Sequence, residues 1–416
     1  MSKPTGKEVD ARDRAFGQRV AELRKTRGLT QQQLAALLNG RTSSWMSQVE
    51  RGIQPVRRLD VLQEIADALG VSTQALDPSA PIPAPPTPPA EIHANDLDGA
   101  RMVISGHPAL SVLLGAAPGE TVPLEQLSDQ VDEIWELTHQ ARFAEVSDMV
   151  TELVPELERA VRTVSDQDRP RTYRLLSRAY QALAAAFARQ GDSRASWVAA
   201  DRAVTAAELS GDVLLVFAGV YRMVHAFVRL GNKSEAEHAV RAAVDALSQR
   251  TDLSPEGLSV LGSLHLVKAL VHARCGQRAE ARTELEKARI VADRLGEDRN
   301  DYNLEFGPTN VAIQTVATAV DLGDAGEALE VGLTINASAL SPERRGRLLM
   351  DLGRAHAQRR HLGDAVDCLL RAEEVSPETV RTHTAVRQAV KELVLLAGPN
   401  APRELTDLAE RTSAME

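Results

Sequence analysis

Cysteines, aromatic residues and long apolar runs are scarce in this sequence. Its two cysteines, Cys275 and Cys368, lie far apart and do not form the disulfide framework of a small secreted domain. Residues 1–16 lack the apolar core of a signal peptide, and no apolar run approaches the roughly 18 residues that a membrane span needs. We therefore expect a soluble cytoplasmic protein with reduced thiols and no membrane partner.

Alternating runs of β-branched residues, the pattern typical of strands, are also few. The chain is 43% hydrophobic but only 3% aromatic, and it is rich in Ala, Leu, Arg and Glu. These residues favour helix, so the predicted fold class is all-α. A length of 416 residues predicts at least two domains.

A proline-rich segment marks the predicted domain boundary. Seven of the twelve residues from Pro78 to Pro89 are proline, which predicts an extended polyproline spacer. Residues 1–77 carry 12 Lys and Arg against 9 Asp and Glu, whereas the whole chain has a net charge of −10. A basic module joined to an acidic one indicates a domain that binds a polyanion attached to one that does not. We expect domains at 13–77 and 96–416, with a linker at 78–95.

Residues 29–52 carry the pattern of two short helices joined by a tight turn. Thr30 and Gln33 form a predicted capping box, Asn39-Gly40 supplies the turn, and Thr42 or Ser43 begins the second helix. The first helix of the pair is expected to end at about Leu38. Flanking patterns predict three further helices, at about 13–27, 59–69 and 72–76. The residues spaced to pack the two short helices on one another are Leu34, Ala35, Leu38, Met46 and Val49.

This part of the chain resembles the helix-turn-helix domain of the Xre family, the phage-repressor-like regulators. The resemblance spans residues 14–77 and rests on Leu23-Arg24, Gly28–Gln31, Leu34-Ala35, Ser47, Val49–Gly52, Pro55, Leu59, Ile65-Ala66 and Leu69–Val71. The chain departs from the family pattern in the turn, where four residues stand between Ala35 and Gly40 in place of three. The extra residue lengthens the turn and changes the expected angle at which the second helix enters a groove.

The resemblance implies that the second helix lies in the DNA major groove with its N-terminal residues at the base edges. Trp45 has two interpretations, an apolar contact to thymine or sugar, or packing under the turn. Glu50 is assigned to structure, paired with Arg19 or Arg24. A single domain buries too little surface for tight binding, so we expect a homodimer on an inverted-repeat operator in double-stranded DNA. The candidate DNA-binding residues are Gln31, Arg41, Thr42, Ser43, Ser44, Trp45, Gln48, Arg51, Arg57 and Arg58.

The C-terminal part repeats a short signature in which a Gly ends one helix and an Ala follows five positions later. Stacked helix pairs of this kind bury their apolar faces against one another, so the pattern predicts an α-solenoid. It resembles tetratricopeptide repeats, with residues 377–415 as a capping helix pair, and an unrelated helical bundle is the alternative. The copies are Gly231 with Ala236, Gly276 with Ala281 and Gly323 with Ala328, and the imperfect ones are Gly191 with Ser196 and Arg360 with Ala365.

A helix-turn-helix domain followed by such repeats resembles regulators that respond to secreted signalling peptides, and also a broad group of actinobacterial regulators. The resemblance implies a peptide or small-molecule effector. The candidate ligand residues recur at intervals of three to four and are expected to share a helix face: Tyr302, Asn303, Phe306, Asn310 and Gln314. The alternative is that Phe306 and Tyr302 pack between repeats, while Gly307-Pro308 starts a helix.

The sequence contains no motif typical of catalysis. His265, His272 and Cys275 fit one helix edge, but no carboxylate or thiol nearby in sequence completes a metal site. No Gly-rich phosphate loop or nucleophile constellation is present, so we predict no enzymatic activity, cofactor or metal. We predict a sequence-specific DNA-binding transcriptional regulator whose helical domain dimerises and senses a signal. The alternative is a protein-interaction scaffold with only weak DNA tethering.

Overall fold

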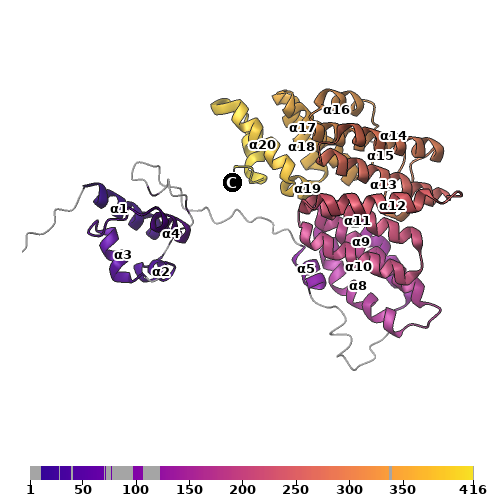
Figure 1. The fold of residues 1–416 in the computed structure, drawn as a ribbon, viewed down its shortest axis with the longest axis horizontal. Coiled ribbons are helices and arrows are strands. Elements are labelled where there is room, and N and C mark those ends of the chain that lie inside the picture. Colours follow the sequence, from indigo (N-terminus) through magenta and orange to yellow (C-terminus); the bar gives the residue numbers. More distant parts are fainter. Residues whose placement is uncertain are drawn as a thin grey trace, which may run out of the picture. The chain divides into compact units, whose positions relative to one another are not determined.

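The computed structural model describes residues 11–27, 29–38, 41–69, 71, 76, 97–105, 122–336 and 340–415. The chain divides into two compact units, Met1–Ala94 and Asn95–Glu416, which we describe separately (Figure 1). Elements in the described ranges are helical apart from one isolated β-bridge, between Arg299 and Phe306, so the predicted all-α class is confirmed. The predicted spacer, the turn Asn39-Gly40 and the helix at 72–76, apart from Leu76, lie outside the described residues.

The N-terminal unit contains α1 (Ala11–Thr26), α2 (Gln31–Ala36), α3 (Ser43–Glu50) and α4 (Leu59–Leu69). The capping box of Thr30 and Gln33 begins α2, as predicted. Thr42 caps α3, where its hydroxyl accepts a hydrogen bond from the backbone N–H of Trp45 at 3.2 Å. Helix α1 begins before Asp13, and α2 ends at Ala36, two residues before the predicted Leu38.

The core of this unit holds α3 firmly against α1 and α2. Helix α1 crosses the C-terminal end of α3 at Gly17, where a Cβ atom would collide with the carbonyl oxygens of Val49 and Glu50. A residue without a side chain is therefore required at this crossing. The five residues predicted to pack α2 on α3 are all at most 4% exposed. Val20, Leu23, Ile65, Ala66 and Leu69 are buried in the same core.

The C-terminal unit begins with α5 (Asp98–Ser105), which packs on α8, and continues as helix pairs stacked in chain order (Figure 1). A short 3₁₀ turn, Asp301–Asn303, separates the fourth pair from the fifth. The pairs are α7 (Leu124–His139) with α8 (Phe143–Thr163), α9 (Arg169–Arg189) with α10 (Ser193–Ser210), α11 (Val213–Leu230) with α12 (Lys233–Ser248), α13 (Pro255–Arg274) with α14 (Arg278–Leu295), α15 (Pro308–Leu322) with α16 (Ala325–Gly332), and α17 (Pro342–Gln358) with α18 (Leu362–Val375).

The first helices of successive pairs contact one another and form an inner layer. Helix α7 contacts α9, and the series continues through α11, α13 and α15 to α17, with the second helix of each pair outside. Helix α17 also contacts α7, so the superhelix curves far enough to bring its first and last pairs together. This arrangement is the α-solenoid predicted from the repeated glycines.

The turn inside each pair holds one residue in the left-handed region, where glycine is favoured. Ala141, at φ +58°, occupies this place in the first pair, which has no marker glycine and was therefore missed in the sequence. In the other pairs the residue is Gly191, Gly231, Gly276, Gly323 or Arg360. The residues five positions later are at most 1% exposed, and small side chains there allow close helix packing: Ser196, Ala236, Ala281, Ala328 and Ala365.

The C-terminal segment differs from the predicted helix pair. It forms α19 (Pro377–Thr382), α20 (Thr384–Ala397) and α21 (Arg403–Arg411). His383 has an extended backbone, with ψ 111°, and this conformation divides the first predicted helix into α19 and α20.

Helix α11 also differs from expectation. Its 18 residues, Val213–Leu230, are long and apolar enough to cross a membrane by length and composition, so the prediction that no run approaches this length is wrong. The helix contacts α9, α10, α12 and α13 in the solenoid, and its His225 and Arg229 line a cavity. These contacts are those of a core helix in a repeat array.

Candidate functional site

Helix α3 has one buried and one exposed face. Met46 and Val49 are fully buried, whereas Ser43 and Ser44 are exposed at the N-terminus of the helix. Gln48 lies one turn further along and is half-buried. Helix α3 thus presents two exposed hydroxyls at its N-terminus and a half-buried amide one turn further along.

Arg41 stacks on Trp45 beside the start of α3. The guanidinium carbon lies 4.6 Å from the centre of the indole ring, and the half-buried ring packs against the core. Arg41 Nε is buried and has no hydrogen-bond partner among the described residues. The ring therefore packs against the core of the unit, while its packing under the turn and its contact with DNA stay predictions. The stacked ring in turn holds the charge of Arg41 next to the exposed serines.

A network of hydrogen bonds around Glu50 joins the three helices. Arg24 donates two hydrogen bonds to the Glu50 carboxylate, at 2.5 and 3.1 Å, and one to the carbonyl oxygen of Leu29 at 2.6 Å. Gln31 Nε2 donates to Glu50 Oε2 at 2.7 Å. The hydrogen bond to Glu50 raises the pKa of Arg24 further above its ordinary value. Glu50 therefore has the structural role assigned to it from the sequence, with Arg24 as its partner.

A shallow hollow of about 220 Å³ lies beside α3 and gathers several of the predicted residues. Arg41, Trp45, Arg57 and Arg58 line it. Arg57 lies 3.3 Å from Asp13, but its side chain is 72% exposed, so water weakens this ion pair and leaves the guanidinium available to a phosphate. The hollow thus brings three arginine side chains together beside α3.

The other candidates lie outside this hollow. Gln31 is held at the N-terminus of α2 by Glu50, and Arg51 is exposed, with its Nε donating to the Ser47 carbonyl oxygen at 3.2 Å. Gln54, which also lines the hollow, was missed in the sequence. It follows α3 in a loop that has no periodic pattern to mark it.

The five ligand candidates in the C-terminal unit do not share a helix face. Tyr302 and Asn303 have φ values of +52° and +56°, and α15 begins only at Pro308. Left-handed residues interrupt the helical period on which the prediction rested. The prediction of a shared face is therefore wrong, although the alternative start of a helix at Gly307-Pro308 is confirmed.

The surroundings of these candidates differ. Phe306 is fully buried against Gly262 of α13, which confirms the alternative of packing between repeats. The Tyr302 hydroxyl donates to Asp212 at 3.3 Å, and the Asn310 side chain accepts a hydrogen bond from Arg344. Gln314, on α15, is the one candidate of the five that lines the same cavity as His225 and Arg229 of α11.

The histidines considered for a metal site have other partners. His265 contacts Glu284 on α14 at 2.6 Å, and His272 contacts Gln277 at 2.5 Å. Elsewhere in the described residues, His356, His361 and Asp364 lie close enough together to hold a metal ion, at the turn between α17 and α18. This group was not predicted from the sequence.

Comparison with known proteins identifies the N-terminal unit. Residues 15–78 match the family model of a helix-turn-helix domain, so this unit is a helix-turn-helix domain in which α2 and α3 are the defining helices. No curated protein matches the chain. Among solved structures, the chain is similar to PlcR of Bacillus thuringiensis in complex with the peptide PapR7 and DNA, at 15% identity over 84% of this chain and 98% of that chain, with a TM-score of 0.37.

Proposed function

We propose that this protein is a sequence-specific DNA-binding transcriptional regulator of the Xre type that acts in the cytoplasm. The observation that carries the proposal is the exposed N-terminal end of α3, with Ser43 and Ser44 beside the stacked pair of Arg41 and Trp45. Serine and glutamine side chains at these positions contact base edges, while the neighbouring arginines contact phosphates.

The working form is proposed to be a homodimer on an inverted-repeat operator. A single helix-turn-helix domain contacts one half-site, and two half-sites one helical turn apart are needed for tight binding. The helical repeat unit is proposed to supply the dimer contact and to bind a peptide or small-molecule signal. Such a signal controls DNA binding by favouring one dimer geometry over the other. No catalytic step is part of this function.

Fluorescence anisotropy with inverted repeats from the gene's own upstream region tests the proposal at moderate salt. Arg41→Ala and Gln48→Ala are each expected to weaken specific binding by about tenfold or more, because each removes a contact to a base or phosphate. Arg403→Ala removes the same charge from a side chain of the repeat unit that is 92% exposed, and it is expected to leave binding unchanged.

Two results would overturn the proposal. One is the absence of a sequence-specific footprint on any such repeat. The other is unchanged binding by both Arg41→Ala and Gln48→Ala. Protein partners recovered without any footprint would instead support an interaction scaffold.

A further inference from the structure

The inner layer of the solenoid encloses a cavity of about 300 Å³, within the range of small-molecule sites. Helices α11, α13, α15 and α17 each contribute side chains to its wall. The turn between α9 and α10 and the first residues of α20 complete it. The wall is therefore built from five helix pairs and the C-terminal segment, and every side chain in it depends on the curvature of the superhelix.

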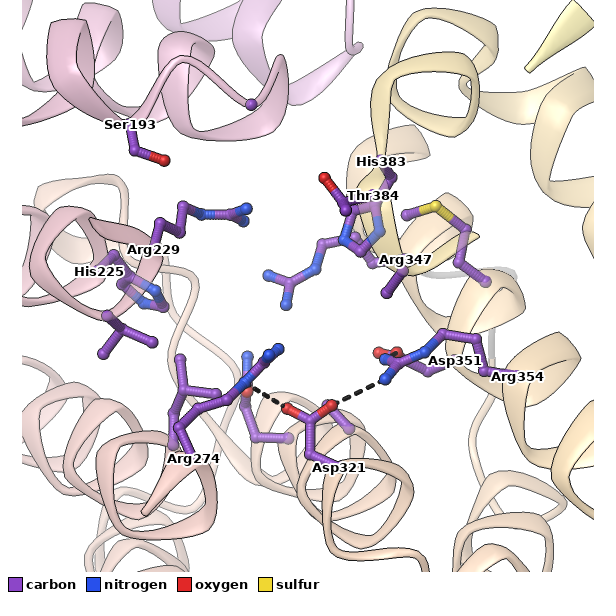
Figure 2. A pocket seen from close by; sticks show the side chains of 17 residues that line it. Ser193, His225, Arg229, Arg274, Asp321, Arg347, Asp351, Arg354, His383 and Thr384 are labelled. Carbon is purple, nitrogen blue, oxygen red and sulfur yellow. Dashed lines mark hydrogen bonds and ion pairs between the residues drawn. The ribbon is translucent and has the colours of Figure 1, made fainter. Parts of the chain in front are cut away.

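The lining carries more positive than negative charge. Four arginines face two aspartates. Asp321 lies 2.9 Å from Arg274 and 2.8 Å from Arg354, and Arg354 also lies 2.8 Å from Asp351 (Figure 2). The two aspartates are thus already paired with Arg274 and Arg354.

Arg229 and Arg347 are the two remaining cations. Figure 2 shows their guanidinium groups pointing into the cavity from opposite walls, Arg229 from α11 and Arg347 from α17. Neither forms a hydrogen bond or ion pair with a residue of the described ranges. Their ten N–H donor positions, five on each group, are therefore open to a ligand.

The surroundings of Arg229 and Arg347 make the charged form of both side chains less favourable than in water. Arg229 has surface open to the cavity, yet enclosure by the helices, followed by repulsion from Arg189 and Arg347, lowers its pKa to about 9. Burial and repulsion from Arg189 also lower the pKa of Arg347, and the attraction of Glu343 and Asp351 does not offset them. Like charges brought together in a partly enclosed space favour the entry of an anion.

Two histidines of the wall respond to the same positive field. Burial, and then the neighbouring arginines, lower the pKa values of His225 and His383 well below the ordinary range. Both imidazoles are therefore neutral at pH 7 and are available as hydrogen-bond donors. His383 Nδ1 is buried without a hydrogen-bond partner among the described residues. The N-terminal end of α20, which begins at Thr384, adds the positive end of a helix dipole.

We propose that this cavity binds a small organic molecule with two anionic groups, either phosphates or carboxylates. Arg229 holds one group and Arg347 the other, because planar guanidinium groups bind both oxygens of a carboxylate or phosphate at once. His225, His383 and Gln314 supply neutral hydrogen bonds around them. The five candidates named from the sequence contribute only Gln314 to this site.

A bound dianion joins helices that are far apart in the chain. It replaces repulsion between α11 and α17 with attraction to a common ligand, and so favours a tighter curvature of the superhelix. Its use as the signal for DNA binding rests on the proposed regulatory function. Its binding to the cavity does not, and it can be measured without DNA.

Calorimetric titration of the full chain with pyrophosphate, citrate and acetate tests the site at constant ionic strength in potassium chloride. Pyrophosphate or citrate is expected to bind at least about tenfold more tightly than acetate, because only these probes carry more than one anionic group. The tighter of the two probes identifies the ligand as a phosphate or a carboxylate compound. Arg229→Gln and Arg347→Gln are each expected to weaken that binding by about tenfold or more.

The matched control is Arg289→Gln, an exposed arginine of α14 paired with Glu286 and Asp293, which should bind the probe like the wild type. Without a probe, Arg347→Gln is expected to melt at or above the wild-type temperature, since it removes repulsion between neighbouring arginines. Loss of an arginine with a structural role would instead lower the melting temperature. The proposal is overturned if neither probe binds, if acetate binds as tightly as both, or if Arg229→Gln and Arg347→Gln bind like Arg289→Gln.

Discussion

Arg24 clamps the carboxylate of Glu50 and thereby ties α1 to the last residue of α3. The two hydrogen bonds measure 2.5 and 3.1 Å, and the two side chains are only 11% and 7% exposed. Gln31 donates to the same carboxylate from the start of α2. One buried charge pair thus sets the relative positions of all three helices of the helix-turn-helix domain.

Glu50→Gln is expected to destabilise the N-terminal unit by about 3 kcal/mol, because the substitution leaves the Arg24 charge partly buried without a counter-ion. Urea unfolding of the full chain, followed by hydrogen exchange in peptides from residues 14–69, measures this loss. Glu64→Gln is the matched control, since Glu64 forms no hydrogen bond or ion pair with a described residue, and it is expected to change stability by less than about 0.5 kcal/mol. Equal stability of the two variants would contradict the structural role of Glu50.

Arg57→Ala is expected to weaken operator binding about equally for all sequences and to reduce the slope of log affinity against log salt by about one. The reason is that an exposed arginine at the edge of the hollow releases about one counter-ion from a phosphate. Anisotropy titrations at several salt concentrations measure the slope. Gln48→Ala serves as the comparison, because losing an uncharged side chain should change sequence preference and leave the slope as it is. An unchanged slope for Arg57→Ala would show that Arg57 does not contact a DNA phosphate.

Gly262→Ala is expected to destabilise the C-terminal unit by about 1–3 kcal/mol, because the new methyl group would overlap the buried ring of Phe306. Gly363→Ala provides the control in the same unit. A Cβ at Gly363, in α18, meets no atom within 4 Å, so the control is expected to be neutral or to stabilise by up to about 1 kcal/mol. Thermal and urea unfolding of the full chain compare the two. A neutral Gly262→Ala would show that Phe306 does not occupy this position.

The ion cluster around Glu284 predicts a loss of stability in acid. Burial alone would raise the pKa of Glu284, but hydrogen bonds from His265, Lys287 and Lys268 outweigh it and lower the pKa to about 2. A carboxyl group with a lowered pKa in the folded state contributes stability above its ordinary pKa, near 4.5, and loses it as the pH falls toward 2.

Glu284→Gln should therefore be less stable than the wild type at pH 7, and the difference should shrink as the pH falls from about 4.5 toward 2. Unfolding in urea at a series of pH values measures this difference. Glu286→Gln, at an exposed pair with Arg289, is the control and should show a much smaller difference at every pH. A gap between Glu284→Gln and the wild type that does not change with pH would contradict the ion cluster.

The N-terminal unit could be predicted closely because its signals are local. The capping box at Thr30, the cap at Thr42 and the helix at 59–69 depend on residues within a few positions of one another, and the structure has all three. Trp45 could not be resolved in this way. Its packing depends on Arg41 and the core, and sequence spacing does not reveal which of two faces a ring adopts.

In the C-terminal unit, the pairing of helices was predictable and the ligand site was not. Tyr302 and Asn303 fit a helical period in the sequence, but both residues adopt left-handed backbone conformations. The sequence did contain a weaker signal of a charged cluster. Arg189, Arg229, Arg274 and Asp321 each stand two residues before a glycine that turns a helix pair, so the repeat places them at equivalent positions.

Local patterns were enough to predict the caps and core of the helix-turn-helix domain and the five helix pairs that carry a marker residue, because these features depend on short-range backbone and packing preferences. Tertiary structure alone decided which charges meet. Arg229 and Arg347 are more than a hundred residues apart, and only the curvature that brings α7 against α17 places them on opposite walls of one cavity. Electrostatic interactions depend on distance in space, and that distance is set by the sum of small rotations between successive helix pairs.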